Sequence, residues 1–541
     1  MAEARQFDAI VVGGGSGGCV VTHRLVKAGW RVLLLEAGPS DDHVFIKMPA
    51  TFVRVIGTER TWVYESAPQP EAGNRRMFVP QGKTLGGGSS VNAMVYIRGQ
   101  AQDYDGWAGA GCSGWSWNDV LPWFRKAEAN QRLAGDFHGT DGPLKVSDTR
   151  FRHPLSLAFV KGAQECGLNY NHDFNGADQS GVGFYQTTTH EGERASTSAT
   201  YLAEVRDNFL LTVVTGALVH RVVVEGGRAV GVVWRDASGQ HEARASREVV
   251  LSAGALATPK LLMLSGIGPG EQLQRFGIDV LRDLPGVGEN FQDHLEVSVY
   301  GRCREPISLL GNDQGLAALK HGLQWKLFRT GLLTSNVVES GGFVDTTGAG
   351  RPDIQFHVLP TLVGDVDREP LPGHGISLNP CFLRPASRGV VRLASADPEA
   401  AADFDGRFLS QRSDVDTLIR GVKLARRILR APSMAKMIDT ELAPAASADL
   451  TDDQLEAHVR SHAKTVYHPS GTCRMGAESD PMSVLAPDLR VRGIQGLRVA
   501  DASAFPLLVS GNTNAPVVML AERCAAFILS QTGAPSPAVS A

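Results

Sequence analysis

Residues 8–36 read DAIVVGGGSGGCVVTHRLVKAGWRVLLLE, and this stretch indicates the fold class. Asp8–Val12 is short, apolar and β-branched, which is typical of a strand buried in a parallel sheet. Ser16–Lys27 has helical character and ends before Gly29, and glycine commonly follows the last turn of a helix. Arg31–Leu35 is a second apolar strand. Strand, helix and strand in this order predict a βαβ unit, the start of an α/β fold.

The connection between the first strand and the helix carries a nucleotide-binding pattern. Gly13, Gly15 and Gly18 form Gly-x-Gly-x-x-Gly: the first allows a tight turn, the second lets backbone approach a pyrophosphate, and the third lets the helix pack on the strand. The start of the helix at Ser16 attracts phosphate charge. Glu36 ends the second strand, where it can accept hydrogen bonds from a ribose. The unit predicts dinucleotide binding, with a mere tight turn as the alternative, and does not separate FAD from NAD.

A second glycine-rich stretch, residues 82–99, reads GKTLGGGSSVNAMVYIRG. The three glycines and two serines of Gly86–Ser90 are too permissive for the interior of a helix or strand, because glycine loses more backbone freedom on folding than other residues do. Such a run suits a place where backbone approaches a bulky ligand. A plain glycine turn is the alternative.

The remaining sequence is of two kinds. Leu210–Trp234 alternates and carries a Gly-Gly turn, which predicts a β-hairpin, and Glu248–Ala253 is typical of another buried strand. Residues 300–460 instead mix strand-like and helical pieces, which indicates a second domain. The tail, residues 533–541, is rich in Pro, Ser and Ala and is expected to be disordered.

Composition narrows the class of protein. The chain has 541 residues, of which 43% are hydrophobic and 20% charged, so it can bury a sizeable core. Its net charge of −4 gives no basic surface for nucleic acid. Seven scattered cysteines include no Cys-x-x-Cys pair, so we expect reduced thiols in the cytoplasm and no disulfide framework or metal site. We expect no signal peptide and no transmembrane segment, while peripheral contact with a membrane stays open.

Further motifs lie downstream of these glycines. The small residues of Ser252–Gly266 suit close packing of a strand on a helix, and Gly288–His294, which reads GENFQDH, is expected to organise a loop through Asn290 and Asp293. His468–Gly476 reads HPSGTCRMG, and the last motif, in residues 497–519, holds Asp501 and the run Asn512-Thr513-Asn514.

The two glycine stretches, the His-Pro element and the Asn-Thr-Asn element together resemble the glucose–methanol–choline (GMC) family of flavin-dependent alcohol oxidoreductases. No second fingerprint follows a strand, which leaves an additional NAD site unsupported. The resemblance implies an α/β protein with a Rossmann-type FAD-binding domain and a second, α+β substrate-binding domain on a mostly antiparallel sheet. It spans about residues 6–530, with the FAD domain in 1–155, 200–300 and 465–541 and the substrate domain in 156–199 and 301–464.

The resemblance also implies which residues contact FAD. In the family the second glycine stretch lies over the flavin and its pyrophosphate, and backbone near the predicted hairpin meets the adenine. Some choline-oxidising relatives link the flavin to a histidine where this chain has Val91, which has no nucleophilic atom, so the resemblance implies noncovalent FAD. The cofactor-binding residues, with those of the fingerprint, are Gly13, Gly15, Ser16, Gly18, Glu36, Gly86, Gly87, Ser89, Asn92, Ala93, Val219, Asp501 and Asn514.

The implied reaction is oxidation of a primary alcohol to the aldehyde, with hydride transfer to flavin N5 and electrons passed on to O₂ or a quinone-like acceptor. Such a reaction needs a base for the hydroxyl proton, and a histidine with a pKa near 6.5 suits that task at neutral pH. His468 takes this role by resemblance. Asn512 stands at the family position filled by Asn or His, where it would hydrogen-bond the substrate oxygen.

The substrate is less defined by the sequence. Trp62, Glu296 and Tyr467 stand where choline-oxidising relatives carry an aromatic residue, a glutamate and the aromatic residue before the base. Together they could hold a quaternary ammonium, or they could serve packing alone. Alkanol-oxidising relatives keep similar residues, and Thr513-Asn514-Ala515 looks nearer to them. A choline-specific enzyme and an FAD-containing hydroxynitrile lyase are the alternatives.

Overall fold

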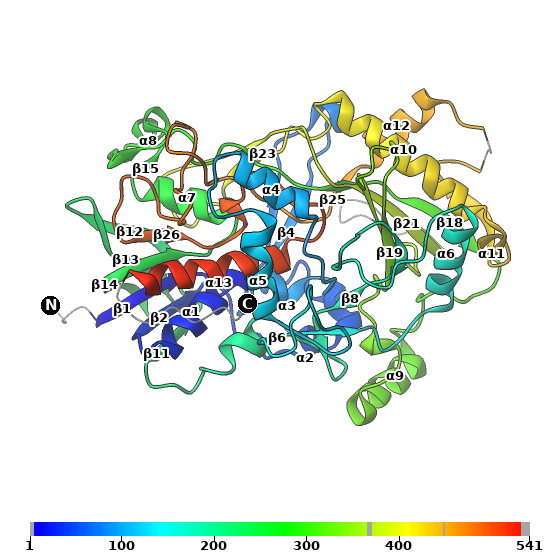
Figure 1. The fold of residues 1–541 in the computed structure, drawn as a ribbon, viewed down its shortest axis with the longest axis horizontal. Coiled ribbons are helices and arrows are strands. Elements are labelled where there is room, and N and C mark those ends of the chain that lie inside the picture. Colours follow the sequence, from blue (N-terminus) through cyan, green and yellow to red (C-terminus); the bar gives the residue numbers. More distant parts are fainter. Residues whose placement is uncertain (1–4, 365–370, 447–448, 532–541) are drawn as a thin grey trace.

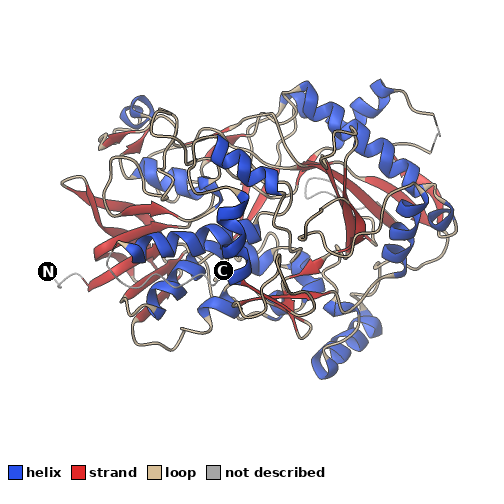
Figure 2. Ribbon diagram, in the orientation of Figure 1, coloured by secondary structure: helices blue, strands red, loops and turns tan. Residues whose placement is uncertain are grey.

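A computed structural model of the protein describes residues 5–364, 371–446 and 449–531. The tail for which we expected disorder, residues 533–541, lies outside them. Two sheets follow one another along the long axis, with helices packed around both (Figure 1, Figure 2). This agrees with the predicted α/β architecture of a Rossmann-type half joined to a second half on an antiparallel sheet. No helix among the described residues is long and apolar enough to cross a membrane.

The first sheet has a parallel centre. β1 (Arg5–Val12) lies between β2 (Val32–Glu36) and β14 (Gly239–Leu251) and runs parallel to both, and α1 (Ser16–Lys27) has the predicted bounds. The predicted βαβ unit is therefore confirmed. The other strands are β11 (Leu211–Thr215), the hairpin of β12 (Leu218–Glu225) and β13 (Arg228–Asp236), and β26 (Leu497–Val499), which pairs with the carboxyl end of β14.

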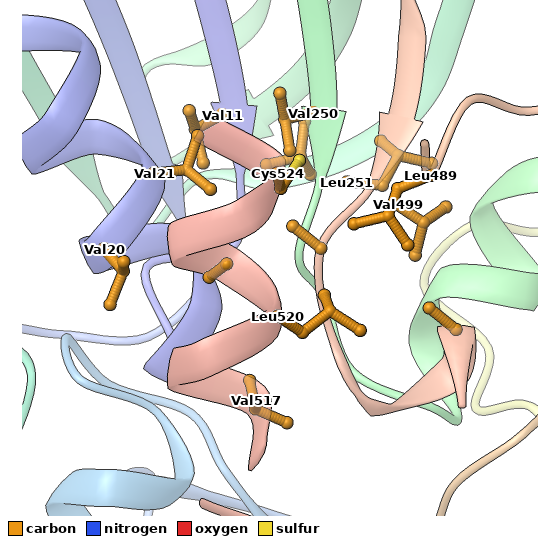
Figure 3. Close-up of a cluster of buried hydrophobic side chains, with 14 of the residues drawn as sticks. Val11, Val20, Val21, Val250, Leu251, Leu489, Val499, Val517, Leu520 and Cys524 are labelled. Carbon is orange, nitrogen blue, oxygen red and sulfur yellow. The ribbon is translucent and has the colours of Figure 1, made fainter. Parts of the chain in front are cut away.

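The carboxyl-terminal helix completes the core of this half. α13 (Asn514–Ser530) is apolar nearly all round and therefore buried. Figure 3 shows it crossing the sheet beside α1, with side chains from four distant parts of the chain meeting between them. The residues labelled there are Val11, Val20, Val21, Val250, Leu251, Leu489, Val499, Val517, Leu520 and Cys524.

The second sheet is antiparallel at every pairing between its described strands. Its main path is β24 (Ile438–Ala443), β18 (Val299–Cys303), β21 (Gly375–Phe382), β20 (Ile354–Leu359), β19 (Ser340–Val344) and β7 (Gly181–Phe184). The short strands β17 (Leu295–Glu296) and β25 (Lys464–Thr465) join it at one side. The predicted division at residue 300 thus falls inside β18, and the domain ranges themselves stay a prediction.

Helices and small sheets surround the two main sheets. The remaining helices are α2 (Val44–Lys47), α3 (Gly88–Val91), α4 (Ala101–Gly109), α5 (Trp117–Ala127), α6 (Pro154–Glu165), α7 (Ala257–Leu264), α8 (Gly270–Arg275), α9 (Gly315–Phe328), α10 (Arg412–Leu429), α11 (Pro432–Ala435) and α12 (Asp452–His462). The remaining strands are β3 (Thr61–Glu65), β4 (Phe78–Gly82), β5 (Glu128–Asn130), β6 (Leu144–Asp148), β8 (Gln186–Thr187), β9 (Thr189–His190), β10 (Glu193–Arg194), β15 (Ile267–Gly268), β16 (Arg282–Asp283), β22 (Val390–Arg392) and β23 (Asp403–Asp405).

The second glycine stretch corrects one expectation. We expected Gly86–Ser90 to avoid helix, yet α3 is a single helical turn that includes Gly88 and both serines. Only Gly86 and Gly87 need the left-handed region, with φ of 82° and 50°. The serine hydroxyls donate back to the carbonyls of Gly86 and Leu85 at 2.6 and 2.7 Å, which stabilises the turn despite its glycine.

Candidate active site

One cavity of about 1030 Å³ joins the two halves of the molecule. The turn between β1 and α1, the glycine stretch before α3 and the start of α13 line one side, and strands of the antiparallel sheet line the other. The predicted residues on its wall are Gly13, Gly15, Ser16, Glu36, Trp62, Gly87, Asn92, Ala93, Val219, Glu296, Tyr467, His468, Asp501, Asn512 and Asn514. The fold therefore gathers both halves of the predicted site into one space.

The fingerprint glycines leave no room for side chains. A Cβ on Gly13 would lie 2.4 Å from the Ser252 carbonyl oxygen, and one on Gly18 would lie 1.9 Å from the Gly13 carbonyl oxygen. Gly18 is absent from the cavity wall, so its role is the close packing of helix on strand. No side chain among the described residues caps the start of α1, which leaves the first backbone N–H groups open to an anion.

Glu36 lies at the carboxyl end of β2, beside this turn. Its carboxylate accepts hydrogen bonds from the backbone N–H groups of Gly14 and Gly38, both at 2.8 Å. Burial raises the pKa of Glu36 to about 7, although the two N–H groups act in the opposite direction. Glu36 thus braces the glycine turn as well as facing the cavity.

The two glycine stretches touch one another. The Gly86 N–H donates to the Gly14 carbonyl at 2.7 Å, and a Cβ on Gly87 would lie 2.6 Å from the Gly15 Cα. Gly86 and Ser89 are not on the cavity wall, and the buried Ser89 hydroxyl bonds to Gly86 and Thr197 instead. These two residues shape the stretch, while Gly87 exposes its backbone to the cavity.

The segment after α3 is held by a residue that the sequence did not reveal. The Asn92 Oδ1 accepts hydrogen bonds from the Met94 N–H at 3.0 Å and from Arg194 Nη1 at 2.9 Å. Burial lowers the pKa of Arg194 to about 9, and no carboxylate within the described residues pairs with it. Because its oxygen is occupied, Asn92 keeps its amide hydrogens for a group in the cavity.

The start of α13 is tied to the start of α1. The Ser16 hydroxyl donates to Asn514 Oδ1 at 2.8 Å. Asp501 accepts from the Gly254 N–H and the Thr258 hydroxyl on one oxygen, and from Ser503 on the other. The Asp501 carboxylate therefore shapes the rim through these protein partners.

His468 and Asn512 face each other at the cavity wall. Asn512 Nδ2 lies 3.4 Å from His468 Nε2, and Asn512 Oδ1 accepts from Gln355 Nε2 at 3.1 Å. The amide is therefore oriented with its oxygen toward β20 and its hydrogens toward His468 and the cavity. The predicted pair is brought together, and Gln355 is the residue that fixes it.

The hydrogen bonds behind His468 assign its proton. His294 Nε2 lies 3.0 Å from the Leu383 carbonyl, which can only accept, so this nitrogen carries the hydrogen. Burial lowers the pKa of His294 to about 4, which keeps the ring neutral with Nδ1 as an acceptor. His468 Nδ1, 3.0 Å from that atom, must then be the donor. His468 Nε2, toward the cavity, is left as a free base.

The environment of His468 also favours the neutral ring. Burial, with smaller contributions from His294 and His357, holds the pKa of His468 well below its usual 6.5. Its backbone N–H donates to Asp293 Oδ1 at 2.8 Å, and the Thr465 hydroxyl donates to the other oxygen at 2.5 Å. Asp293 thus organises a loop, as the sequence predicted, and this loop carries His468.

The wall opposite the glycines carries an enclosed carboxylate. Glu296 Oε2 lies 2.8 Å from His357 Nδ1, and Oε1 accepts from Asn379 Nδ2 at 3.1 Å and faces Lys464 Nζ at 3.7 Å. The Trp62 ring is covered by Lys83, whose Nζ lies 4.1 Å from its centroid. Glu296 and Trp62 line the cavity but already have cationic neighbours.

Several of these partners could not be read from the sequence. His294 lies in the GENFQDH motif, for which the sequence predicted a role of the neighbouring Asp293 but none of His294. His357, Lys464, Gln355 and Arg194 stand in no motif, and only the register of the antiparallel sheet and the approach of β10 to α3 bring them to the site.

Comparison with known proteins gives the family. Two models described as GMC oxidoreductase match residues 7–296 and 385–521. The chain belongs to the GMC oxidoreductase family. An alcohol dehydrogenase [acceptor] of Pseudomonas putida is 45% identical to this GMC oxidoreductase over 97% of the chain and 96% of its own length. A mitochondrial choline dehydrogenase of Mus musculus is 41% identical over 97% of the chain and 89% of its own.

Solved structures share the fold of this GMC oxidoreductase. A pyridoxine 4-oxidase from Mesorbium loti superposes with a TM-score of 0.87 at 29% identity, covering 96% of this chain and 98% of its own. A fungal aryl-alcohol oxidase gives 0.85 at 26% identity, covering 97% and 99%. The FAD cofactor of the family fits the residues present, because the glycine wall, the open N–H groups of α1 and Glu36 border one continuous cavity.

Proposed function

We propose that this GMC oxidoreductase oxidises an uncharged primary alcohol to the aldehyde, with His468 as the general base and Asn512 as the residue that orients the substrate. The observation that supports this proposal most directly is the unprotonated Nε2 of His468 beside the Asn512 amide on the wall of the cavity. An unprotonated nitrogen and a donor next to it are what a hydroxyl needs, because it gives a proton and presents an oxygen.

The residues of the chain and the cofactor have separate roles in the proposed reaction. The glycine wall and Glu36 would hold FAD, which would supply the acceptor for the hydride of the carbinol carbon. His468 Nε2 takes the hydroxyl proton, and the second amide hydrogen of Asn512 donates to the same oxygen. His294 and Asp293 hold the imidazole in place, so that little reorientation is needed during the reaction.

The charges of the cavity support an uncharged substrate. The Glu296 carboxylate faces Lys464 and His357, and Lys83 lies over Trp62. A quaternary ammonium would therefore meet a carboxylate and a ring that already have cationic neighbours. His357 Nε2 and Asn379 Oδ1 are buried without a partner among the described residues and both residues line the cavity, so they offer hydrogen bonds to a neutral polar group.

Retention of FAD rests on noncovalent contacts in this proposal. Val91 lines the cavity and cannot form a bond to the flavin. Acid precipitation should release the yellow colour into the supernatant, and colour that stays in a washed pellet would contradict this. The seven cysteines are free in the structure, which fits the proposed cytoplasmic location. The electron acceptor is O₂ or a quinone-like molecule.

An alcohol panel tests the proposal. Each alcohol is added anaerobically and flavin bleaching is followed, and then hydrogen peroxide release and dye reduction are compared to identify the class of acceptor. Neutral primary alcohols should bleach the flavin and choline should do so poorly. Release of cyanide from a cyanohydrin without bleaching would instead identify a lyase, and preference for choline would overturn the uncharged substrate.

A further inference from the structure

The side of α9 that faces away from the protein is apolar. This helix, GLAALKHGLQWKLF, contacts the rest of the chain mainly through the buried Trp325, whose Nε1 donates to the Gly192 carbonyl at 2.8 Å. Figure 1 shows it projecting from the molecule below β19. The exposed large apolar residues of α9 are Leu316, Leu319, Leu323, Leu327 and Phe328, which are 84%, 59%, 49%, 66% and 69% exposed.

In an ordinary surface helix the apolar stripe packs against the core, whereas on α9 it faces solvent. Spacings of three and four residues place Leu316, Leu319, Leu323 and Leu327 along one face. Most other exposed large apolar residues stand singly, which is ordinary for a protein surface. A contiguous row on one projecting helix marks an interaction surface.

The charges beside this face are basic. Lys320 and Lys326 are exposed on α9 and have no ion pair within the described residues, and the helix contains no acidic residue. Arg150 adds a third exposed cation, since its Nη1 donates to the Arg329 carbonyl just after the helix at 3.1 Å. Asp313, the acidic residue just before the helix, is paired with Arg54 at 3.0 Å.

We propose that the outer face of α9 docks onto the surface of an anionic lipid bilayer. Leucine along one face with lysine beside it is the composition of a helix that lies in the membrane interface. A second copy of the chain is a poorer occupant, because a two-fold contact would place the lysines of both copies against each other. The charge of the patch complements anionic headgroups instead.

Docking of this face would turn the cavity toward the lipid. Leu309, Leu310 and Asp313 line the cavity and lie within a few residues of the start of α9. Leu310 and Val53, which also lines the cavity, are each about half exposed and extend the apolar surface to its mouth. Apolar alcohols that partition into a bilayer would then reach the site from the membrane side.

Flotation with lipid vesicles tests the proposal on the FAD-loaded, full-length enzyme without substrate, so the result does not depend on the proposed reaction. The enzyme should float with vesicles of phosphatidylcholine and phosphatidylglycerol, and less well with phosphatidylcholine alone or at high salt. Leu319→Gln combined with Leu323→Gln should weaken binding more than about tenfold, because each leucine loses apolar burial. Lys320→Gln combined with Lys326→Gln should cost about fivefold per lysine on the anionic vesicles.

A control double variant tests whether the effect is specific to the outer face of α9 or follows from making any two exposed leucines polar. Leu157→Gln combined with Leu281→Gln alters two leucines that are similarly exposed elsewhere, 48% and 53%, and should leave binding unchanged. Thermal unfolding and the flavin spectrum verify that every variant is folded. The proposal is overturned if the enzyme floats with neither vesicle, or if the α9 leucine variant floats as well as the control. It is also overturned if that variant only converts a dimer into a monomer.

Discussion

The two walls of the cavity are built by opposite means. Over the parallel sheet the wall is backbone, and Gly13 and Gly87 are packed so closely that a single added carbon would overlap a neighbour. Over the antiparallel sheet the wall is side chains, and His468, Asn512 and Glu296 are each held by hydrogen bonds from neighbouring residues. The first wall should therefore be sensitive to added atoms and the second to removed ones, a difference that substitutions can test.

The largest effect is expected from removing the base. His468→Ala should lower turnover by roughly 10²–10⁴-fold, the usual contribution of a general base, while FAD stays bound to the other wall. Stopped-flow measurement of anaerobic flavin reduction gives the rate. His190→Ala, at an exposed histidine of β9, is the control and should behave as wild type. Near-normal turnover of His468→Ala would remove this residue from the mechanism.

An added carbon on the glycine wall should act on the cofactor. Gly87→Ala would place its Cβ 2.6 Å from Gly15 Cα at a φ of +50°, so we expect about 1–2 kcal/mol of destabilisation and lower FAD occupancy after gel filtration. Gly29→Ala is the matched control, because its φ is also positive, a Cβ there meets nothing within 4 Å among the described residues, and Gly29 lies off the cavity wall. Equal occupancy in both variants would show that the wall tolerates added atoms.

Removing the partner of the base should cost less than removing the base. His294→Phe takes away the acceptor for His468 Nδ1 and leaves a buried donor unpaired, so kcat should fall by about tenfold to a hundredfold. His294→Asn keeps an oxygen that can accept and should recover part of the rate. The same loss in both variants would indicate a packing role in place of a positioning one.

Glu296 should matter more to stability than to specificity. Glu296→Gln leaves His357 without its carboxylate partner, and a loss of about 1–3 kcal/mol in the free energy of unfolding is expected from denaturant titration. The ratio of kcat/KM for choline to that for a neutral alcohol should not change. A strong loss confined to choline would show that the carboxylate binds the cation.

The smallest effect concerns pH. Because the pKa of His468 lies well below 6.5, the base stays unprotonated as the pH falls from 8 to 6.5, and activity is lost only when the pH falls through the lowered pKa. The acid limb of kcat/KM for a neutral alcohol should therefore lie below pH 6.5. A limb at or above that value would mean that the imidazole is more solvated than its burial indicates.

The βαβ unit and its glycines could be predicted from local sequence patterns. Asp8–Val12 and Ser16–Lys27 could be placed from periodicity and the glycine fingerprint, because the residues that define them are neighbours in sequence. Gly86–Ser90 was recognised as a ligand-facing stretch, but not as a stretch ending in a helical turn. Hydrogen bonds from the serine hydroxyls to backbone carbonyls close that turn, and residue composition alone does not predict such contacts.

The family and the cofactor follow from the sequence, and His468 is predicted from it as the base, since each depends on residue types in a fixed local order. The packing of the two sheets sets which nitrogen of His468 carries the hydrogen, which residues face Glu296, and which side of α9 the described residues leave uncovered. Those properties depend on partners between 61 and 174 positions away in the chain, or, for α9, on the absence of a packing partner along one face. No local sequence pattern predicts such contacts, because they form only when the two sheets pack together.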